Sequence, residues 1–438
     1  MTADWLSVRA LNRATLDRQL LLRRDARPAR QAIEQLTALQ AQAPLAPYVG
    51  LWTRLSGFRH EALEDLLTER SVVRAHLLRN TVHLVTAEDF LSFRALFQPL
   101  MQRGLAGNFG RNLTGVDLAE LQQEAADLLT QGPLTRPQLA SRLAERWPGR
   151  DPASLAHAAT HLLPLVQVPP RGLWSLRDRA GPAAFALASA WLADPGRTAV
   201  TPPDPGRTAV TPPDPGRALE QLVLRYLGAY GPASVRDIQA WSGLSRLREV
   251  TDRLGPRLRP FTGPGGARLL DLADAPRPDP DAPAPPRFLP EYDNLLLSFA
   301  DRSRVIPHGR PVPLPPGHGA TTGTLLVDGF WQADWKITKG IKGPDRAVLH
   351  ILPFQPLGPA QASDVAAEGS RLLEFAAPAA AHDVRISPPG GRPPGDPPPR
   401  GLPAPRTPWP GGRPPGTPRP PARPAAGNDT VTHDRSGS

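Results

Sequence analysis

The chain has 438 residues, 40% of them hydrophobic, and this length suffices for two or three domains with buried cores. It contains no cysteine, which excludes disulfide bridges, cysteine-ligated zinc, iron–sulfur clusters and thiol nucleophiles. The 51 basic and 41 acidic residues leave a net charge of +10, which favours a polyanionic partner.

The N-terminus lacks the uninterrupted apolar core of a signal peptide, and no run approaches the 18 apolar residues of a membrane span. We therefore expect a cytoplasmic protein with no contact to a membrane. A nucleic-acid partner would make it nucleoid-associated.

The same local order, helices followed by short strands, recurs along the chain. Residues 10–86 follow it loosely, with helices predicted at "NRATLDRQLLL", "ARQAIEQLTAL" and "HEALEDLLTER" and a hairpin at "VVRAHLLRNTVHLVT". Residues 118–175 repeat it with three helices and the strand-like "VQVPPRGLWSL". Residues 194–217 then give the unit "DPGRTAVTPP" twice with a partial third copy, which is typical of an expanded linker.

The pattern is clearest over residues 218–272. A long amphipathic helix is followed by a short helix that ends at Gly243, and an arginine-rich helix begins near Ser245, a favourable N-cap. Two strands flank Gly-Pro-Gly-Gly in "RLRPFTGPGGARLLDL". Three helices and a β-hairpin predict a winged helix, with a helix-turn-helix bend around Gly243. A stack of such units indicates nucleic-acid binding, and the alternative is a stack used only for protein contacts.

The C-terminal part begins with a second proline-rich linker at 274–287. Residues 288–386 mix strands ("TGTLLVDGFWQADWKI", "RAVLHILPF") with a helix ("SDVAAEGSRLLEFA"). Residues 387–438 hold 17 prolines and 7 arginines against 3 aspartates, so we expect them to be disordered. This tail is either a basic segment that touches nucleic acid or a frame-slipped end of the gene.

These boundaries predict seven segments. They are winged-helix domains at 1–110, 111–193 and 218–273, a repeated linker at 194–217, a second linker at 274–287, a mixed α/β region at 288–386 and a tail at 387–438.

Common catalytic signatures are missing from the sequence, among them the phosphate loop, the dinucleotide-binding glycines, the zinc-protease HExxH and the hydrolase GxSxG. His157 and His161 lie one helical turn apart, but their apolar helix favours a structural role over a metal site, and we predict no metal. We interpret Asp301 and Asp328 as partners in ion pairs that support the fold.

Gln40 and Gln42 are the remaining polar pair of interest. Ala43 precedes Pro44 and is pushed towards extended geometry, so the helix before them is predicted to end near Leu39. In an extended segment both amides point to one side, where a carbonyl oxygen can accept a hydrogen bond from water and face a developing cation. The alternative is a pair of capping side chains at a turn, which the spacing alone favours.

The surrounding stretch, "LQAQAPLAPYVGLWTRLSGF", resembles the Gln-x-Gln motif of the AlkZ-type DNA glycosylases, a bacterial winged-helix family with YcaQ-like members. YcaQ-like members have aspartate at the second motif position, whereas this chain has glutamine. Further blocks match, so the resemblance covers about residues 4–386; the matching blocks are 74–90, 239–254, 288–306, 323–337 and 364–375.

The resemblance implies a mainly α fold with β-hairpin wings (α+β): three tandem winged-helix domains in a C-shaped arrangement around DNA, followed by the mixed α/β region and the disordered tail. Its known enzymes excise N-alkylated purines, and some unhook interstrand crosslinks. It implies double-stranded DNA carrying alkylated purines as the partner, no cofactor, and a monomer.

The two motif glutamines of the family are catalytic, which assigns that role to Gln40 and Gln42. Gln42 is expected to position the water and Gln40 to support it electrostatically. The hairpin that contacts DNA in the family matches residues 74–85; the DNA-binding candidates there and on the arginine-rich helix are Arg79, Thr81, His83, Arg246 and Arg248.

Residues 1–335 contain no lysine, and a Schiff-base lyase step needs an amine. We therefore expect a monofunctional glycosylase, and the resemblance implies N7-alkylguanine as the base that it removes. The alternative function is a non-catalytic winged-helix DNA-binding protein or transcriptional regulator, which would bind intact duplex without preference for lesions.

Overall fold

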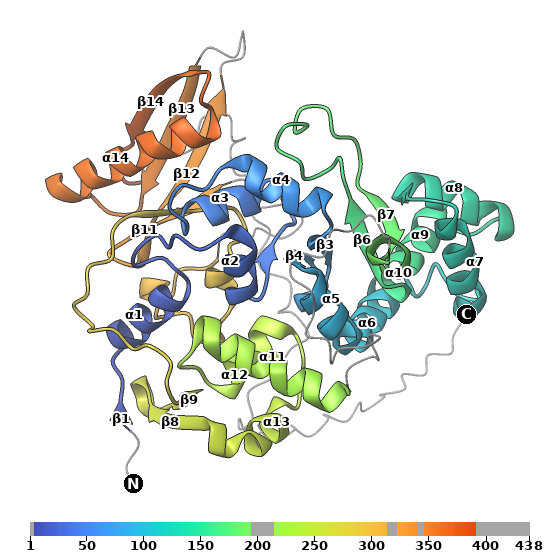
Figure 1. The fold of residues 1–438 in the computed structure, drawn as a ribbon, viewed down its shortest axis with the longest axis horizontal. Helices are drawn as coiled ribbons and strands as arrows, with labels where there is room; N and C mark the ends of the chain where they lie inside the picture. Colours follow the sequence, from blue (N-terminus) through green and yellow to red (C-terminus); the bar gives the residue numbers. More distant parts are fainter. Residues whose placement is uncertain (1–3, 194–213, 313–321, 340–345, 391–438) are drawn as a thin grey trace, which may run out of the picture. The chain divides into compact units, whose positions relative to one another are not determined.

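A computed structural model of the chain describes residues 4–193, 214–312, 322–339 and 346–390 (Figure 1). Most of the repeated linker and nearly all of the proline-rich tail lie outside the described residues. Within the described ranges, no helix has both the length and the apolar character that a membrane span requires.

The N-terminal part is built from short helices and a central hairpin. Ser7 caps the first helix, since its hydroxyl accepts a hydrogen bond from the Ala10 N–H at 3.1 Å. The elements are β1 (Asp4–Trp5), α1 (Val8–Arg18), α2 (Ala29–Gln35), β2 (Leu39–Gln40), α3 (Ala46–Trp52), α4 (His60–Thr68), β3 (Val72–His76), β4 (Val82–Thr86), α5 (Ala87–Phe93) and α6 (Gln98–Phe109), with 3-10 turns at Leu78–Asn80 and Arg94–Phe97. Strands β3 and β4 confirm the predicted hairpin.

Helix α2 ends earlier than predicted. The expected end near Leu39 is wrong, because the helix stops at Gln35 and Thr37 takes a left-handed φ of 67°. Leu39 then enters β2 and pairs with Leu84 of β4. The turn at Thr37 thus ends the helix early enough for Leu39 and Gln40 to form strand β2.

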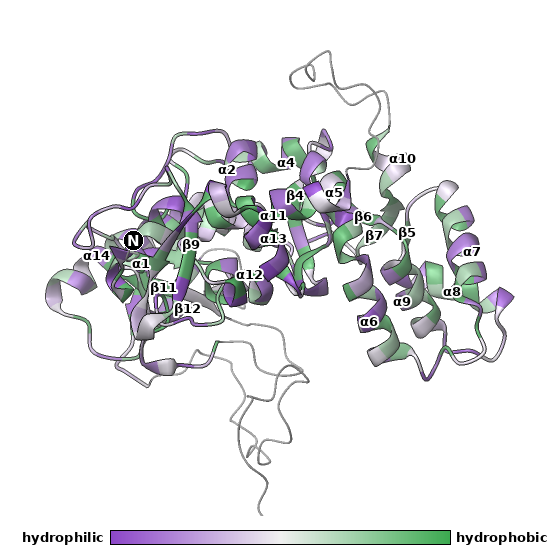
Figure 2. Cartoon of the chain, turned by 90° about the horizontal axis from the view of Figure 1, so that it is seen from below, coloured by the Kyte–Doolittle hydropathy of each residue, from purple (hydrophilic) through white to green (hydrophobic). Residues whose placement is uncertain are grey.

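The second part places three helices beside strands. Thr135 and Gln138 form the capping box that starts α8. The elements are α7 (Leu118–Thr130), β5 (Leu134–Thr135), α8 (Arg136–Arg146), α9 (Pro152–Leu162), β6 (Leu165–Val168), β7 (Ala184–Leu187) and α10 (Ala188–Leu192). Figure 2 shows hydrophilic and hydrophobic residues side by side on α7 and α8, as expected of helices with one buried face.

One six-stranded sheet joins the first two parts, in the order β2-β4-β3-β6-β7-β5. The joint is the antiparallel pairing of β3 with β6, in which Arg74 lies opposite Gln167. The hairpin that follows Gln40 and Gln42 is therefore held on both of its edges.

Residues 215–272 confirm the predicted order of three helices and a hairpin. The elements are α11 (Pro215–Tyr230), α12 (Val235–Ser242), α13 (Leu247–Arg253), β8 (Leu258–Thr262) and β9 (Arg268–Leu272), with 3-10 turns at Gly255–Arg257 and Pro264–Gly266. Helix α12 ends at Gly243, whose left-handed φ of 78° is open to glycine without strain. Strand β1 pairs in parallel with β8.

The predicted N-cap of α13 is wrong. Arg246 occupies that position with a φ of 61°, and Ser245 does not cap the helix. The N–H of Leu247 instead donates to the Gln239 side-chain oxygen at 3.2 Å. The side-chain amide of Gln239 in α12 thus caps α13, as the serine hydroxyl was expected to do.

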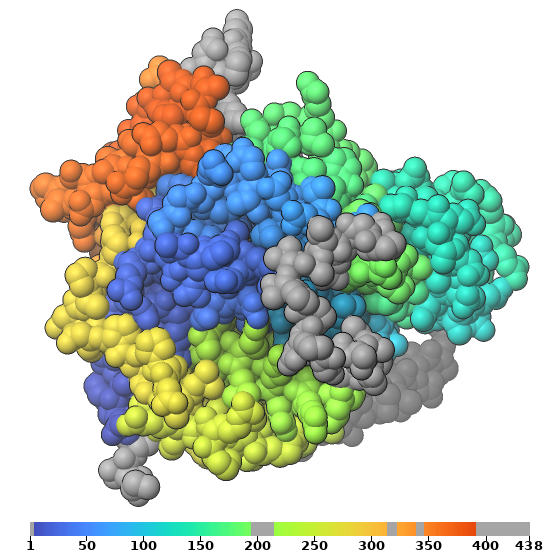
Figure 3. All heavy atoms as spheres, in the orientation of Figure 1, coloured from blue at the N-terminus to red at the C-terminus, as the bar shows by residue number. Residues whose placement is uncertain are grey.

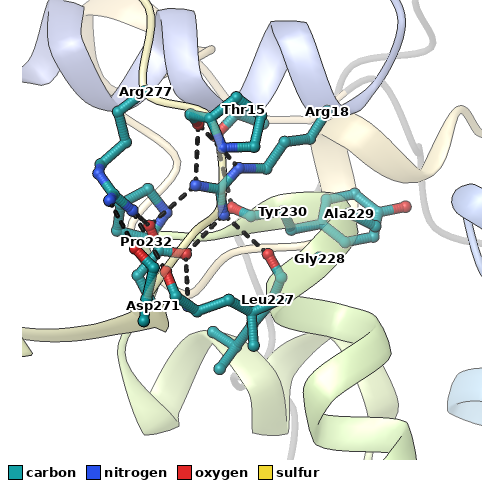
Figure 4. A network of polar contacts seen from close by, with 12 residues as sticks. Thr15, Arg18, Leu227, Gly228, Ala229, Tyr230, Pro232, Asp271 and Arg277 are labelled. Carbon is teal, nitrogen blue, oxygen red and sulfur yellow. Dashed lines mark hydrogen bonds and ion pairs between the residues drawn. The ribbon is translucent and has the colours of Figure 1, made fainter. Parts of the chain in front are cut away.

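A buried ionic network fastens α1 to residues 215–277 (Figure 4). Arg18 donates to both carboxylate oxygens of Asp271, at 2.6 and 2.8 Å, and to the carbonyl oxygen of Leu227 at 2.9 Å. Arg277 reaches the same carboxylate at 2.6 Å. In Figure 3 the surface of the first residues, dark blue, meets the yellow-green surface of this part.

The last part is a five-stranded sheet in the order β10-β11-β12-β13-β14, covered by α14. Helix α14 links β13 to β14, which are parallel and therefore need a crossover. The elements are β10 (Arg287–Leu289), β11 (Gly323–Val327), β12 (Phe330–Lys339), β13 (Arg346–Pro353), α14 (Pro359–Ala376) and β14 (Ala381–Ile386), with 3-10 turns at Asn294–Leu297 and Pro307–Gly309.

The two aspartates expected to form ion pairs differ. Asp328 confirms the expectation, since it pairs with Arg9 and Arg13 of α1. The expectation for Asp301 is wrong for the residues that the structure describes. Its carboxylate accepts the Ser303 N–H at 3.0 Å and shapes a turn, and its charge acts on the nearby Arg304 without a direct ion pair.

Candidate active site

Gln40 and Gln42 lie at the edge of the six-stranded sheet. Gln40 is opposite His83 in the β2–β4 ladder, and the Ala41 N–H donates to the Val82 carbonyl oxygen at 2.8 Å, so residues 39–41 are extended, but the predicted extended segment does not continue through Gln42. The chain bends at Gln42. Gln40 is 6% exposed, whereas Gln42 is an exposed residue.

The Gln40 amide has a defined orientation. Its side-chain oxygen accepts a hydrogen bond from Arg79 Nη2 at 2.9 Å. Because a guanidinium group can only donate, the atom facing Arg79 must be the carbonyl oxygen and not the amide nitrogen. Within the described residues, the Gln40 NH2 group donates no hydrogen bond and remains available.

The Gln42 amide is only weakly engaged. Its side-chain oxygen lies 3.4 Å from the Val82 nitrogen, at the long limit of a hydrogen bond. Breaking this weak hydrogen bond costs little free energy when the amide turns to a ligand. The pair therefore combines a fixed, buried amide with an adaptable, exposed one.

Asn294 completes the polar contacts around Gln40. Its side-chain oxygen accepts from Arg79 Nη2 at 2.8 Å, and its side-chain nitrogen donates to the Ala38 carbonyl oxygen at 2.9 Å. It thereby fixes the backbone directly before β2. A cavity of about 10 Å³, the space of one water, lies beside Gln40 and is lined in part by Asn294, Asp293 and Arg54.

Two of the hairpin residues predicted to bind DNA have polar atoms engaged within the hairpin itself. The ring of His83 is fully buried, and its Nδ1 lies 2.9 Å from the Thr81 carbonyl oxygen. Burial lowers the pKa of His83 to about 3, and the charge of Arg79 adds to this shift, so the ring is neutral at pH 7. The Thr81 hydroxyl donates to the Leu78 carbonyl oxygen at 3.1 Å.

Arg246 and Arg248 lie apart from this network, at the start of α13. Both are exposed, and within the described residues neither guanidinium group forms a hydrogen bond or an ion pair. Two unpaired cations at the start of the helix after the bend at Gly243 suit contacts to phosphate groups. Their role in DNA binding stays a prediction.

His157 and His161 have the contacts of structural histidines. The His157 ring stacks on Phe109 with the ring centres 4.2 Å apart. The Nδ1 atom of His161 lies 2.7 Å from the His157 carbonyl oxygen one turn earlier. No group of three or more metal-binding side chains occurs in the part of the chain that the structure describes.

Comparison with known proteins identifies the family of the chain. Residues 33–375, which include Gln40, Gln42, Arg79 and Asn294, match the family model described as "DNA glycosylase AlkZ-like". The chain belongs to the AlkZ-like family. This membership confirms the enzyme class expected from the Gln-x-Gln motif, a DNA glycosylase that acts on N-glycosidic bonds, and disfavours a non-catalytic regulator.

A relative and a solved structure from Streptomyces sahachiroi agree with this family assignment. The relative is named "Interstrand DNA cross-link repair glycosylase" and is 26% identical over 279 residues, 62% of this chain and 68% of the relative. The solved structure of "DNA glycosylase AlkZ" superposes with a TM-score of 0.65 at 20% identity, covering 88% of this chain and all of that one. The mixed α/β fold is thus shared with that AlkZ structure.

Asn294 was not among the predicted site residues, although it lies in the block 288–306 that matches the family. The signal available was a polar pair, Asp293-Asn294, between a buried strand and an apolar run, which is an unusual place for polar side chains unless they have buried partners.

Proposed function

We propose that this AlkZ-like glycosylase removes N7-alkylguanine from double-stranded DNA and unhooks interstrand crosslinks formed through that atom. The observation that carries the proposal is the pair of neutral amides, Gln40 and Gln42, at the edge of the sheet. The printed name of the Streptomyces relative, a crosslink repair enzyme, supports the crosslink as substrate. Because its substrate is DNA, we infer that the enzyme acts at the nucleoid.

Neutral amides suit this substrate because the leaving group is already activated. Alkylation at N7 places a positive charge on the guanine, so departure of the base neutralises it. Water forms a bond to C1′, the bond from C1′ to N9 breaks with its electron pair going to the base, and a proton passes to solvent. The enzyme has to hold the water and to stabilise an oxocarbenium-like transition state.

Gln42 positions the water in this mechanism, since the residue is exposed and its side-chain carbonyl oxygen is only weakly engaged. Gln40 supports the same water electrostatically from its fixed position. The product is an abasic site and the strand stays intact, because residues 1–335 hold no lysine to form a Schiff base.

A finer fold assignment accompanies this function. We infer that residues 1–110, 111–193 and 218–273 each correspond to a winged helix and that residues 288–386 form a further α/β region. The order of helices and strands in 215–272 supports the third unit most directly. The C-shaped arrangement around DNA stays a prediction.

The decisive experiment uses a duplex with one N7-methylguanine and a second duplex with a nitrogen-mustard crosslink, followed by alkaline cleavage of abasic sites. We expect base release that falls about 10²-fold in Gln42→Ala and in Gln40→Ala. Gln123→Ala, an exposed glutamine of α7, serves as the matched control and should keep the wild-type rate. No release from either duplex at any enzyme concentration would refute the proposed substrate.

A borohydride experiment tests the monofunctional mechanism separately. Reduction during turnover traps a Schiff base as a stable protein–DNA adduct. We expect no adduct and no strand cleavage before alkali. A trapped adduct would contradict the mechanism while leaving the substrate assignment intact.

A further inference from the structure

Arg79 lies at the tip of the β3–β4 hairpin in a tightly packed place. Arg79 and Asn80 have left-handed φ values of 53° and 57°. A Cβ on Gly104 of α6 would lie 2.8 Å from the Asn80 side chain, and a Cβ on Gly243 would lie 3.3 Å from the Arg79 Cα. The tip is therefore wedged between α6 and the end of α12.

The guanidinium group of Arg79 has three neutral acceptors. They are the Trp241 carbonyl oxygen at 2.6 Å, the Asn294 side-chain oxygen at 2.8 Å and the Gln40 side-chain oxygen at 2.9 Å. No ion pair of Arg79 occurs among the described residues. Burial lowers the pKa of Arg79 to about 10, so the group remains charged at pH 7. The half-buried Arg79 thus relies on neutral acceptors alone, and its three hydrogen bonds fix the guanidinium group against the Gln40 oxygen.

We propose that Arg79 is a positioning residue for Gln40, which it locks so that the amide nitrogen faces the attacking water as a hydrogen-bond donor. This inference rests on the proposed function, in which Gln40 supports that water. The water accepts a hydrogen bond from Gln40 and donates one to Gln42, which leaves a lone pair for C1′. A charged donor on the carbonyl oxygen also polarises the amide and strengthens its N–H groups.

The proposal differs from a direct DNA contact by Arg79, and binding data separate the two. We expect Arg79→Met to lower the single-turnover rate on the N7-methylguanine duplex about 10²-fold, while Kd for that duplex and its salt dependence stay unchanged. A phosphate contact predicts the opposite: a weaker Kd and a salt slope smaller by about 1. That outcome would overturn the proposal.

Arg94→Met is the matched control. Arg94 is buried, its pKa is likewise lowered to about 10 by burial, and it donates to a glutamine oxygen, that of Gln98, at 2.9 Å and to the Leu163 carbonyl oxygen at 3.2 Å. It has no bond to Gln40. We expect it to change the melting temperature but not the rate per folded molecule, and Arg79→Lys to recover part of the rate lost in Arg79→Met.

Two variants of Gln40 test the proposal even if Arg79→Met fails to fold. Gln40→Glu keeps an acceptor for Arg79 and the same shape but removes the NH2 donor. We expect it to melt no lower than the wild type and to be as slow as Gln40→Ala. A fast Gln40→Glu beside a slow Gln40→Ala would overturn the donor role alone, whereas a fast Gln40→Ala would overturn the proposed catalytic pair.

The double variant measures whether Arg79 acts through Gln40. We expect Gln40→Ala with Arg79→Met to be no slower than the slower of the two single variants. Multiplied losses would show independent roles and would overturn the positioning role.

Discussion

Arg54 and Asp293 form a buried ion pair with two hydrogen bonds, 2.9 and 3.0 Å long, and their side chains are 1% and 2% exposed. Arg54 follows α3, and Asp293 directly precedes Asn294. The pair therefore joins the segment after the Gln-x-Gln motif to the segment of Asn294, which accepts a hydrogen bond from Arg79. Both residues also line the small cavity beside Gln40.

Removing one partner of this pair should destabilise the protein strongly. Asp293→Ala leaves a buried guanidinium without its carboxylate, and we expect the free energy of unfolding to fall by about 3–5 kcal/mol. Urea denaturation measures the loss. Glu120→Ala, which breaks an exposed ion pair with Arg146, is the control and should cost less than about 1 kcal/mol. Equal losses in the two variants would contradict the importance of burial.

Gly243→Ala should impair both stability and catalysis. The added methyl group would sit in a left-handed backbone 3.0 Å from Leu100 and 3.3 Å from the Arg79 Cα. We expect a loss of about 1–2 kcal/mol from the backbone alone and a slower single-turnover rate because the hairpin tip must move. Gly266 has a similar φ of 77°, and a Cβ added there has no atom within 4 Å. Gly266→Ala therefore measures the cost of the left-handed backbone alone and should keep the wild-type rate. Equal rates in both variants would argue against a sensitive hairpin tip.

The rate of base release should not depend on pH between about 6 and 9. The two amides that we propose as catalytic do not titrate, the pKa of the buried His83 is lowered to about 3, and that of Arg79 is lowered to about 10. Single-turnover rates across this range, corrected for spontaneous depurination, provide the measurement. An inflection near pH 6.5 would reveal a titrating base that this mechanism does not contain.

Asp334 should make stability depend on pH. Burial raises its pKa to about 6, and its carboxylate accepts the Trp331 indole N–H at 3.1 Å. The folded state thus holds a proton that the unfolded state loses near pH 4, so this contribution is present at low pH and is lost as the pH rises through 6. We expect Asp334→Asn to gain about 1–2 kcal/mol relative to the wild type between pH 4 and pH 8.

Asp383 provides the control of opposite sign for this measurement. The side-chain hydrogen bond from Arg385, together with the one from Arg346, lowers its pKa, so its contribution is present above pH 4 and lost on acidification. Asp383→Asn should therefore lose stability relative to the wild type as the pH rises. Urea denaturation at several pH values compares the two variants, and parallel curves would contradict the assignment.

Arg248 should contribute affinity for DNA and not catalysis. We expect Arg248→Ala to weaken binding to any duplex and to lower the salt slope by about 1, with an unchanged rate at saturating enzyme. Arg253→Ala on the same helix is the control, because Arg253 already pairs with Glu220 at 3.0 Å. Equal effects of the two variants would argue against α13 as a phosphate-contacting helix.

Local structure was largely predictable from residue patterns. The hairpin around Gly-Pro-Gly-Gly and the helix end at Gly243 each follow from the conformational preferences of one or two residues. The errors arose where contacts from another element of the fold intervened. Gln239 caps α13 in place of Ser245, and the ladder with β4 ends α2 early.

The site was predictable only in part. The family resemblance predicts Gln40 and Gln42 as catalytic, which stays a prediction, and periodicity carries no information on contacts between residues far apart in sequence. Arg79 and Asn294 are 215 positions apart and meet only in the fold. A basic residue at a hairpin tip is most simply interpreted as a DNA contact, because its buried acceptors belong to other parts of the chain.

The pairing of β3 with β6 has a consequence for how such a protein can evolve. Recombination between related genes exchanges segments that fold alone, and a junction near residue 110 would separate two strands that share hydrogen bonds. A chimera made there would have to match the strand register of both parents. We therefore expect the first two parts to be inherited together, with successful exchanges falling after Leu192, where the last helix attached to the shared sheet ends.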